Sequence, residues 1–291
     1  MKIGIYGQFF YPVTGKFLDQ LFQVIKERNI EFSIERGFKK ILQEKNMLLD
    51  ITSVPVFDIL DSSYDFFFSI GGDGTILSSL NLLEDFSIPV IGINSGRLGF
   101  LASINDFEIR DTLQKIFDKD FKISERSLLE INTSPCSNIH QRLALNEVAL
   151  SRKDTTSMIT VKTWLDDEFV CAYWADGLMI STPTGSTGYS LSCGGPIITP
   201  QTNALVLTPV APHNLNARPL IFPDNVNIRL QVDTRSQHYM ASSDSYITTL
   251  TPDVTIEVKK SPQTIKLVLL QENSFLNTIR NKLMWGEDQR N

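Results

Sequence analysis

The chain has 291 residues, of which 42% are hydrophobic and 21% charged, and its formal net charge is -6 at pH 7. A chain of this length fits one large or two medium-sized domains and buries roughly 70–75% of its unfolded surface, so it needs no metal or disulfide for stability. The acidic balance argues against a general DNA- or RNA-binding surface, which requires a basic face. It does not exclude a small phosphorylated ligand, which needs only a few local donors.

The cysteines Cys136, Cys171 and Cys193 have none of the spacings that are typical of zinc sites. Met1 and Lys2 lead directly into a strand-like segment, without the charged and apolar regions of a secretory signal. No uninterrupted apolar run approaches the roughly 18 residues that a membrane-spanning helix needs. The sequence therefore predicts a reduced cytoplasmic protein with neither a membrane nor a nucleic acid as partner.

The first part of the chain, residues 1–120, alternates strand-like and helix-like segments. We expect strands at Lys2–Gly7, Asp65–Ile70 and Ile88–Ile93, and helices at Phe17–Arg28, Arg36–Leu48, Thr75–Leu83 and Asp106–Phe117. Strands that alternate with helices at this rhythm are typical of an α/β domain with a parallel sheet.

From Phe121 onward the apolar runs are short, rich in Val, Ile and Thr, and separated by turn residues, which predicts an all-β domain over residues 121–270. The expected strands are Leu128–Thr133, Arg142–Leu150, Ser157–Leu165, Leu178–Ser181, Ala204–Val210, Asn227–Val232, Thr255–Val258 and Ile265–Leu269. A helix at Ser274–Leu283 lies in a C-terminal tail, residues 271–291, which we expect to return to the first domain.

The strongest local motif is Gly71-Gly72-Asp73-Gly74-Thr75, which follows a buried strand and precedes a helix. Glycines allow positive φ and a close backbone approach to a ligand, and the N-terminus of the following helix favours an anion. A carboxylate among such groups is poorly suited to bind phosphate, but it can act as a base toward a hydroxyl or as a magnesium ligand. The alternative is a strand–helix turn with an Asp cap.

A second motif runs from Asp176 to Pro196 and is dense in glycine and hydroxyl groups. Its small side chains suit ribose, amide and phosphate recognition, and Tyr189 can stack on a base or hydrogen-bond through its hydroxyl. The alternative is a solvated loop. The hydroxyl-bearing residues are Ser181, Thr182, Thr184, Ser186, Thr187, Ser190 and Ser192, with glycines at Gly185 and Gly188.

Further polar candidates lie outside these two motifs. Asn146 and Glu147 end a β-rich apolar run, where a carboxamide beside a carboxylate could hold a ribose diol, or could be an exposed strand end. Asn94, Gly96 and Gly99 lie in a loop after a parallel strand, where α/β sheets place ligands; Arg97 in the same loop could meet phosphate or lie at the surface. For His213, which lies between turn prolines, we expect a structural hydrogen bond rather than catalysis.

Three common signatures are absent from the sequence. It lacks the GxxxxGK[ST] of P-loop enzymes, the GxGxxG of Rossmann domains after the first strand, and the GxSxG of serine hydrolases. Nucleotide hydrolysis by a P-loop, hydride transfer and serine hydrolysis are therefore not predicted.

Taken together and in this order, the motifs are similar to those of the NAD kinases. The similar segments are Gly71–Thr75, Gly92–Ala102, Leu145–Val148, Asp176–Pro196 and Pro209–Leu220. The resemblance implies transfer of the γ-phosphoryl group of ATP to the 2′-hydroxyl of the adenosine ribose of NAD, giving NADP, with Mg²⁺ or another divalent metal. Whether other nucleotides or polyphosphate replace ATP, and whether NADH is accepted, stays open.

The resemblance also implies roles for individual residues. Asp73 is the base that deprotonates the hydroxyl, and Gly71, Gly72, Gly74 and Thr75 form the phosphate-donor loop, with Gly74 also at the substrate. Asn146 and Glu147 contact the adenosine half of NAD, and Asp176 is an acidic contact that a neighbouring subunit can supply in a homodimer or homotetramer. Further contacts with NAD come from Thr187, Gly188, Tyr189, Ser190, Leu191, Ser192 and Ala211.

Three positions depart from the family pattern. Ser78 and Trp174 stand where basic residues are common, and Tyr246 stands where Gln is common; these departures bear on affinity and donor choice.

A lipid kinase would explain Gly71–Thr75 but not the Asp176–Pro196 segment. A non-catalytic dinucleotide sensor would explain the pocket, but it would not require a carboxylate at Asp73.

Overall fold

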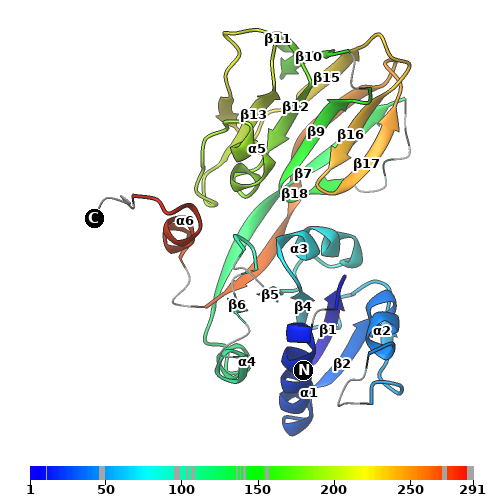
Figure 1. Ribbon diagram of the computed structural model, residues 1–291, viewed down its shortest axis with the longest axis vertical. Coiled ribbons are helices and arrows are strands. Elements are labelled where there is room, and N and C mark those ends of the chain that lie inside the picture. The colour runs from blue at the N-terminus through cyan, green and yellow to red at the C-terminus, as the bar shows by residue number, and fades with distance from the viewer. Residues whose placement is uncertain are drawn as a thin grey trace. The chain divides into compact units, whose positions relative to one another are not determined.

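The computed structural model describes residues 1–10, 12–45, 50–94, 99–102, 104–105, 109–135, 137, 139, 142–154, 157–270 and 274–286. The chain divides into two units, Met1–Glu125 with Ile265–Asn291, and Arg126–Thr264. The first is an α/β unit with a parallel sheet and a C-terminal helix, and the second is built from antiparallel β-sheet, which confirms the predicted fold class (Figure 1).

The sheet of the first unit is parallel, with the strand order β18-β5-β4-β1-β2-β3. Strand β6 also pairs with β5, and Leu267 of β18 lies opposite Val90 of β5. The parallel strands of the unit bring their carboxyl ends to one edge of the sheet, where loops carry function in such folds. The strands are β1 (Lys2–Gly7), β2 (Glu31–Glu35), β3 (Val56–Phe57), β4 (Phe66–Ile70), β5 (Val90–Asn94), β6 (Ile104–Asn105) and the end of β18 (Thr255–Leu269).

The helices of the first unit lie around this sheet (Figure 1). They are α1 (Pro12–Glu27), α2 (Arg36–Gln43), α3 (Asp73–Ser79) with the 3-10 turn η1 (Leu80–Leu82), α4 (Ile109–Phe117) and α6 (Phe275–Leu283). Apolar side chains from strands and helices, such as Ile5, Leu21 and Phe38, form one buried cluster. Helix α6 contacts the segment after β5, since the rings of Phe275 and Phe100 are 6.4 Å apart.

The second unit contains two sheets with a shared core. One is antiparallel in the order β14 (Leu220–Pro223), β13 (Ala204–Val210), β12 (Gly177–Ser181), β9 (Glu147–Arg152), β16 (Tyr239–Ser243) and β17 (Tyr246–Leu250). The other joins β11 (Glu168–Ala175), β10 (Ile159–Leu165), β15 (Ile228–Asp233) and the start of β18, with β7 (Lys122–Ser134) and β8 (Leu143–Ala144) attached. Their inward side chains form one cluster, which includes Val148 and Ile180 from the first sheet and Leu230 and Ile256 from the second.

Several elements differ from the sequence expectation. The two strands expected at Thr255–Val258 and Ile265–Leu269 are one strand, β18, because its polar middle alternates between buried and exposed positions. Helix α2 ends at Gln43, earlier than expected. Strands β11, β16 and β17 were not anticipated, since their Ser, Thr and charged residues weaken the apolar pattern. Gly96, Arg97 and Cys136, which were named from the sequence, lie outside the described residues.

Within the residues that the structure describes, every helix is too short or too polar to cross a bilayer.

Candidate active site

The residues predicted for the site fall into two groups, one in each unit, and each group has its own geometry. In the first unit, the entirely buried strand β4 ends at Ile70 and is followed by Gly71, where φ is +150°. A Cβ at this position would lie 2.2 Å from Oγ1 of Thr75, so only glycine fits the turn. The Gly71 N–H also donates to the carbonyl of Ile93 at 2.8 Å, which ties the turn to the neighbouring strand.

Gly72 and Gly74 differ from Gly71, because a Cβ at either position would meet no atom within 4 Å. Both residues are exposed, and Gly72 is the N-cap of α3 without a side chain to cap it. Packing within the protein therefore does not explain these two glycines. Their open backbone is the kind of surface that a ligand can approach closely.

Asp73, the predicted base, is held by three backbone groups. Its Oδ2 accepts from the N–H of Phe100 at 2.8 Å, and its Oδ1 accepts from the N–H groups of Leu101 and Ala102, each at 3.0 Å. Since a carboxylate offers about four acceptor positions, one remains on Oδ2. A Cβ at Gly99 would lie 1.7 Å from Oδ1, so Gly99 is also required here; the sequence placed Gly99 in a candidate ligand loop but did not link it to Asp73.

In the second unit, the Asn146–Glu147 turn and the Asp176–Pro196 segment lie against each other. Thr182 donates through its N–H to the carbonyl of Asn146 at 2.9 Å and through Oγ1 to the carbonyl of Leu145 at 2.6 Å. A Cβ at Gly185 would lie 2.1 Å from the Asn146 oxygen, and one at Gly188 would lie 3.3 Å from Asn146 Nδ2. The structure thus brings together two segments that the sequence predicts to act jointly.

Glu147 carries a buried polar atom at this junction. Its Oε2 has no hydrogen-bond partner among the described residues and lies 3.4 Å from the position of a Cβ at Gly188. Burial raises the pKa of Glu147 to about 8, and the charge of Asp244 adds to the rise. At neutral pH the Glu147 carboxyl is therefore protonated and can donate a hydrogen bond as well as accept one.

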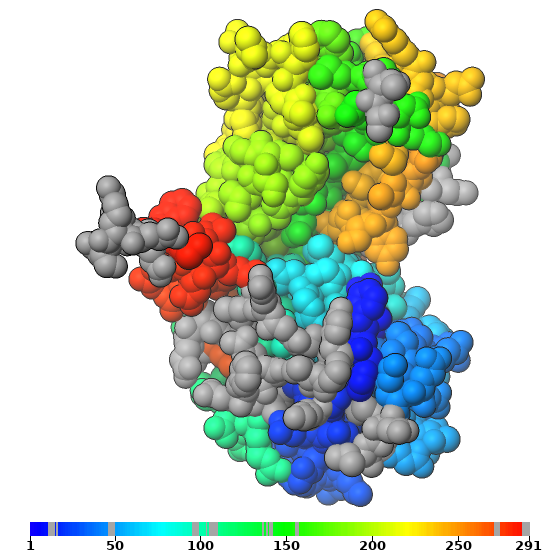
Figure 2. Space-filling model, viewed as in Figure 1, coloured from blue at the N-terminus to red at the C-terminus, as the bar shows by residue number. Residues whose placement is uncertain are grey.

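Most hydroxyls of the second motif build the loop itself. Ser186 Oγ donates to the carbonyl of Pro183 at 2.6 Å, and Thr187 Oγ1 donates to that of Thr184 at 3.1 Å. Ser190 is buried, with its Oγ 2.9 Å from Oγ1 of Thr208. The loop continues through η3 (Gly185–Thr187) into the short helix α5 (Tyr189–Ser192), which lies at the surface of its unit in yellow-green (Figure 2).

The side chains that α5 leaves open to a ligand are few. Tyr189 and Ser192 are exposed, Thr187, Gly188 and Leu191 are half-buried, and Ser190 is enclosed. Burial raises the pKa of Tyr189, and the charges of Asp176 and Glu147 contribute to the rise. The Tyr189 hydroxyl therefore stands within electrostatic reach of both carboxyl groups.

Asp176 and Ala211 lie at the other end of strand β12 from Asn146 and Glu147. Gly177, which follows Asp176, pairs with Val210, whereas Ser181 pairs with Glu147; the rise of a strand separates these two ends by roughly 13 Å. Asp176 Oδ1 is 3.1 Å from Nε of Arg152, and Ala211 has a positive φ of 44°. The chain thus does not gather all its predicted contacts at one place.

Three further residues at the second group were missed as site residues. Asp244 accepts backbone N–H groups of the Asn146–Glu147 turn. Arg126, only 5% exposed, donates to Thr184 Oγ1 at 3.5 Å, and burial lowers its pKa to about 10. Trp174 lies beside His213, with ring centres 4.2 Å apart and ring planes tilted by 45°, and its backbone carbonyl accepts from the backbone N–H of His213 at 2.9 Å.

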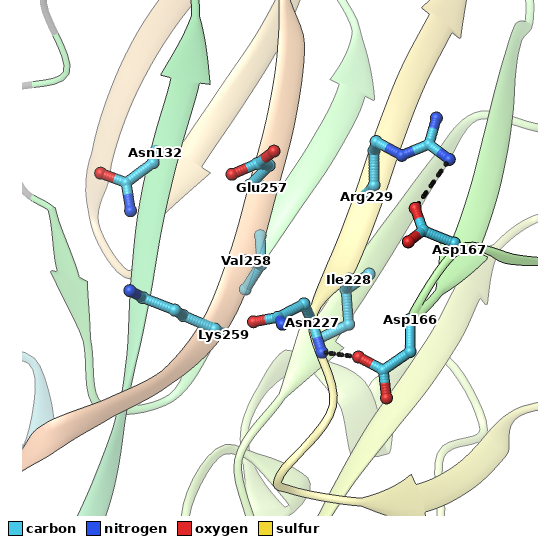
Figure 3. A pocket seen from close by; sticks show the side chains of 9 residues that line it. All are labelled: Asn132, Asp166, Asp167, Asn227, Ile228, Arg229, Glu257, Val258 and Lys259. Atoms are coloured by element: carbon cyan, nitrogen blue, oxygen red, sulfur yellow. Dashed lines mark hydrogen bonds and ion pairs between the residues drawn. The ribbon is translucent and has the colours of Figure 1, made fainter.

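A separate hollow of about 380 Å³ lies at the start of β15 beside β18, lined by Asn132, Asp166, Asp167, Asn227, Ile228, Arg229, Glu257, Val258 and Lys259 (Figure 3). Its charges are partly satisfied within the protein, since Arg229 is 3.6 Å from Asp167 and the Asn227 N–H donates to Asp166 at 2.8 Å. None of the predicted site residues lines this hollow.

Comparison with known proteins finds two matching family models. Residues 12–121 match the ATP-NAD kinase N-terminal domain, and residues 145–270 match the ATP-NAD kinase C-terminal domain. The chain is 54% identical over 294 residues to the NAD kinase of Christiangramia forsetii and 47% identical over 296 residues to that of Flavobacterium psychrophilum, with all of each chain covered.

Two solved structures share the fold. Yeast NADH kinase complexed with NADH has a TM-score of 0.85 at 24% identity, over 99% of this chain and 88% of the other. An NAD kinase from Archaeoglobus fulgidus in complex with ATP has a TM-score of 0.76 at 23% identity, over 98% and 99%. Both halves of the chain match in sequence and in fold, and the chain therefore belongs to the ATP-NAD kinase family.

Proposed function

We propose that this chain phosphorylates NAD, transferring the γ-phosphoryl group of ATP to the 2′-hydroxyl of the adenosine ribose to give NADP. The observation that carries the proposal is the junction in the second unit, where the Asn146–Glu147 turn is locked against Gly185 and Gly188. This junction pairs an amide with a buried carboxyl whose Oε2 lacks a protein partner. Such groups suit the hydroxyls and ring nitrogens of an adenosine.

On the NAD side, donors and acceptors alternate along the junction. The Asn146 amide offers both, and protonated Glu147 adds a donor at Oε2. The exposed Tyr189 ring provides a face for stacking. Thr187, Gly188, Leu191 and Ser192 border these groups, while Ser190 would act from within the loop by holding α5.

On the phosphate side, Gly72 and Gly74 leave the backbone open and Thr75 closes the turn behind them. The remaining acceptor position on Asp73 Oδ2 would take the proton of the 2′-hydroxyl, and the N–H groups of Phe100, Leu101 and Ala102 would hold the carboxylate in place. Positioning of this kind is the main requirement of phosphoryl transfer.

Mg²⁺ or another divalent metal would neutralise charge on the ATP phosphates. Among the residues that the structure describes, no group of three or more His, Cys, Asp or Glu side chains is placed to hold a metal ion. We propose that the ion enters with the nucleotide, bound mainly by phosphate oxygens, as Mg²⁺ commonly is.

We propose a homo-oligomeric enzyme in which a second copy presents Asp176 and Ala211 to the site of the first. Both residues lie at the far end of β12 from Asn146 and Glu147, while Asp176 is also within electrostatic reach of Tyr189 in its own chain. A homodimer is the smallest assembly that permits this exchange, and a homotetramer contains it twice.

A coupled assay tests the proposal and separates it from its alternatives. Protein, ATP, Mg²⁺ and NAD are incubated, and NADP is detected with an NADP-specific dehydrogenase. NADP formation is the expected result. Phosphorylation of diacylglycerol without NADP would instead identify a lipid kinase, and NAD binding without any product would identify a sensor.

A further inference from the structure

Asp244 occupies a turn whose conformation is unusual for its residue type. It follows β16 and, with Ser245, forms the two-residue connection to β17, since Ser243 pairs with Tyr246. Its φ of 50° lies in the left-handed region, which glycine adopts most readily and Asp tolerates. Two-residue hairpin turns commonly place Asp in this region, and here the Asp244 carboxylate also accepts hydrogen bonds from another turn.

The partners of this carboxylate are three successive N–H groups. Asp244 Oδ2 accepts from Leu145 at 2.8 Å, and Oδ1 accepts from Asn146 at 2.9 Å and from Glu147 at 3.1 Å. The Asp244 N–H donates in return to the carbonyl of Glu147 at 2.9 Å. The backbone of the Asn146–Glu147 turn is therefore fixed from both directions by one residue.

The carboxyl groups of Asp244 and Glu147 differ in protonation state. Asp244 is an acceptor in all three bonds, which suits the ionised form, whereas Oε2 of Glu147 has no hydrogen-bond partner in the part of the chain that the structure describes. Burial raises the pKa of Asp244 to about 6, and its three N–H donors oppose this rise; the pKa of Glu147 is higher, at about 8. Near neutral pH, Asp244 carries the charge and Glu147 keeps its proton.

We propose that Asp244 is a positioning residue for dinucleotide binding. Its carboxylate holds the Leu145–Glu147 backbone so that the side chains of Asn146 and Glu147 face the adenosine of NAD beside Gly188. Asp244 itself does not contact the dinucleotide in this role. The inference rests on the proposed function, since it takes NAD as the ligand of the junction.

The variant Asp244→Asn tests the inference, because its carboxamide replaces one acceptor oxygen with a donor. If the amide oxygen keeps the two bonds of Oδ1, the NH₂ group faces the N–H of Leu145, so two donors oppose each other. We expect NAD to bind about 10- to 100-fold more weakly by isothermal titration calorimetry. ATP should retain its KM within about twofold, because the turn contacts NAD.

The matched control is Asp253→Asn, in an exposed turn of the same unit, which should leave NAD affinity unchanged. A double-mutant cycle with Asn146→Ala shows whether Asp244 acts through the turn. We expect the double variant to have about the same NAD affinity as whichever single variant binds NAD less tightly. Effects that multiply would show that Asp244 acts independently of Asn146 and would overturn the proposal.

A milder variant keeps the test informative if Asp244→Asn does not fold. Ser243 Oγ donates to the carbonyl of Leu143 at 3.1 Å. Ser243→Ala therefore removes a neighbouring hydrogen bond between the β16–β17 hairpin and the segment that leads into the Asn146–Glu147 turn, without removing a charge. It should weaken NAD binding by a few-fold at unchanged ATP KM. Unchanged NAD affinity in both variants refutes the positioning role, whereas absence of NADP formation by the unaltered enzyme refutes the proposed function instead.

Discussion

The Cα of Gly185 lies so close to Asn146 that a Cβ added there would be 2.1 Å from the Asn146 oxygen and 2.7 Å from its Cα. Both are backbone atoms, which cannot rotate away as the end of a side chain can. The hydrogen bond from the Gly185 N–H to Thr182 Oγ1 at 3.0 Å fixes the same approach from the loop side. The absence of a Cβ at Gly185 therefore allows the glycine-rich loop to pack against the Asn146–Glu147 turn.

Gly185→Ala is expected to separate these two segments. Overpacking of this kind costs about 1–3 kcal/mol of folding stability, and the displaced Asn146 should weaken NAD binding at least about tenfold. Thermal unfolding and calorimetric titration with NAD measure the two effects. Gly37→Ala is the control, since its Cβ meets only the side-chain end of Glu35 at 3.2 Å and alanine favours helix. Equal behaviour of the two variants would contradict the close approach.

Asp73→Asn is expected to lower kcat by about 10²- to 10⁴-fold, the usual contribution of a positioned base. The variant should also melt at a lower temperature, because the carboxamide cannot accept all three N–H bonds that the carboxylate accepts. Binding of NAD should change little. Steady-state kinetics with the coupled assay measures kcat, and near-normal turnover would remove Asp73 from the role of base.

Gly99→Ala tests whether catalysis depends on the position of the Asp73 carboxylate, because the variant retains this carboxylate. A Cβ at Gly99 would lie 1.7 Å from Asp73 Oδ1, so the variant keeps the carboxylate but displaces it. If catalysis depends on where Asp73 lies, kcat should fall at least about tenfold, since small misplacements of a catalytic group are costly. A variant with wild-type kcat and wild-type melting would show that the loop after β5 does not set the position of Asp73.

The pKa of Glu147 predicts a pH dependence of stability. Its folded pKa of about 8 exceeds the ordinary 4.5 of the unfolded chain, so the contribution of Glu147 to the free energy of unfolding falls as pH rises through this window and is lost above about 8. Asp244 adds a slope of the same sign only up to about 6. Between pH 6.5 and 8, the pH slope of the free energy of unfolding therefore contains the contribution of Glu147 without that of Asp244.

Glu147→Gln should flatten that slope, because glutamine does not ionise. Tyr189 and Cys193 face Glu147 from the α5 segment, and burial raises the pKa of each, so neither ionises within this range. The measurement is urea unfolding of both proteins at a series of pH values. The same slope in wild type and variant would assign the pH dependence to another group.

Mixing two inactive variants tests the exchange of residues between copies. If the site of one subunit uses the partner's Asp176, then Asp73→Asn and Asp176→Asn chains are each inactive but complement each other. After co-refolding of equal amounts, random dimers should regain about a quarter of the wild-type activity. Failure to complement, with both variants folded and oligomeric, would place Asp176 outside the neighbouring site.

The architecture was predictable where burial gave a strong pattern. The fully buried and mostly apolar β4 and β5 and the amphipathic α1 were visible in the sequence, as was the turn at Gly71. The β16–β17 hairpin was not, because Ser, Thr and Asp dominate its ends and its only strong apolar anchors are Tyr239, Ala241 and Leu250. A sheet partner, rather than the local sequence, decides such a strand.

The candidate site shows the same limit. Residue types identified Asn146, Glu147 and the glycine-rich loop, but not which hydroxyls point inward, since Ser186 and Ser190 bond to Ile198 and Thr208 far along the chain. Asp244 lies 98 positions from Asn146, so no local pattern links them. The one signal in the sequence was an Asp-Ser pair between two short strand-like runs, typical of a tight hairpin turn.

The last strand of the protein has a consequence for its synthesis. Because Leu267 of β18 pairs with Val90, the sheet of the first unit receives this strand only after the ribosome has translated the whole second unit. Until then, the Val90 end of that side of β5 presents unpaired main-chain groups, which other nascent chains or chaperones can bind. A fragment that stops before residue 265 keeps this edge permanently, so truncation from the C-terminus should produce aggregation rather than a smaller working domain.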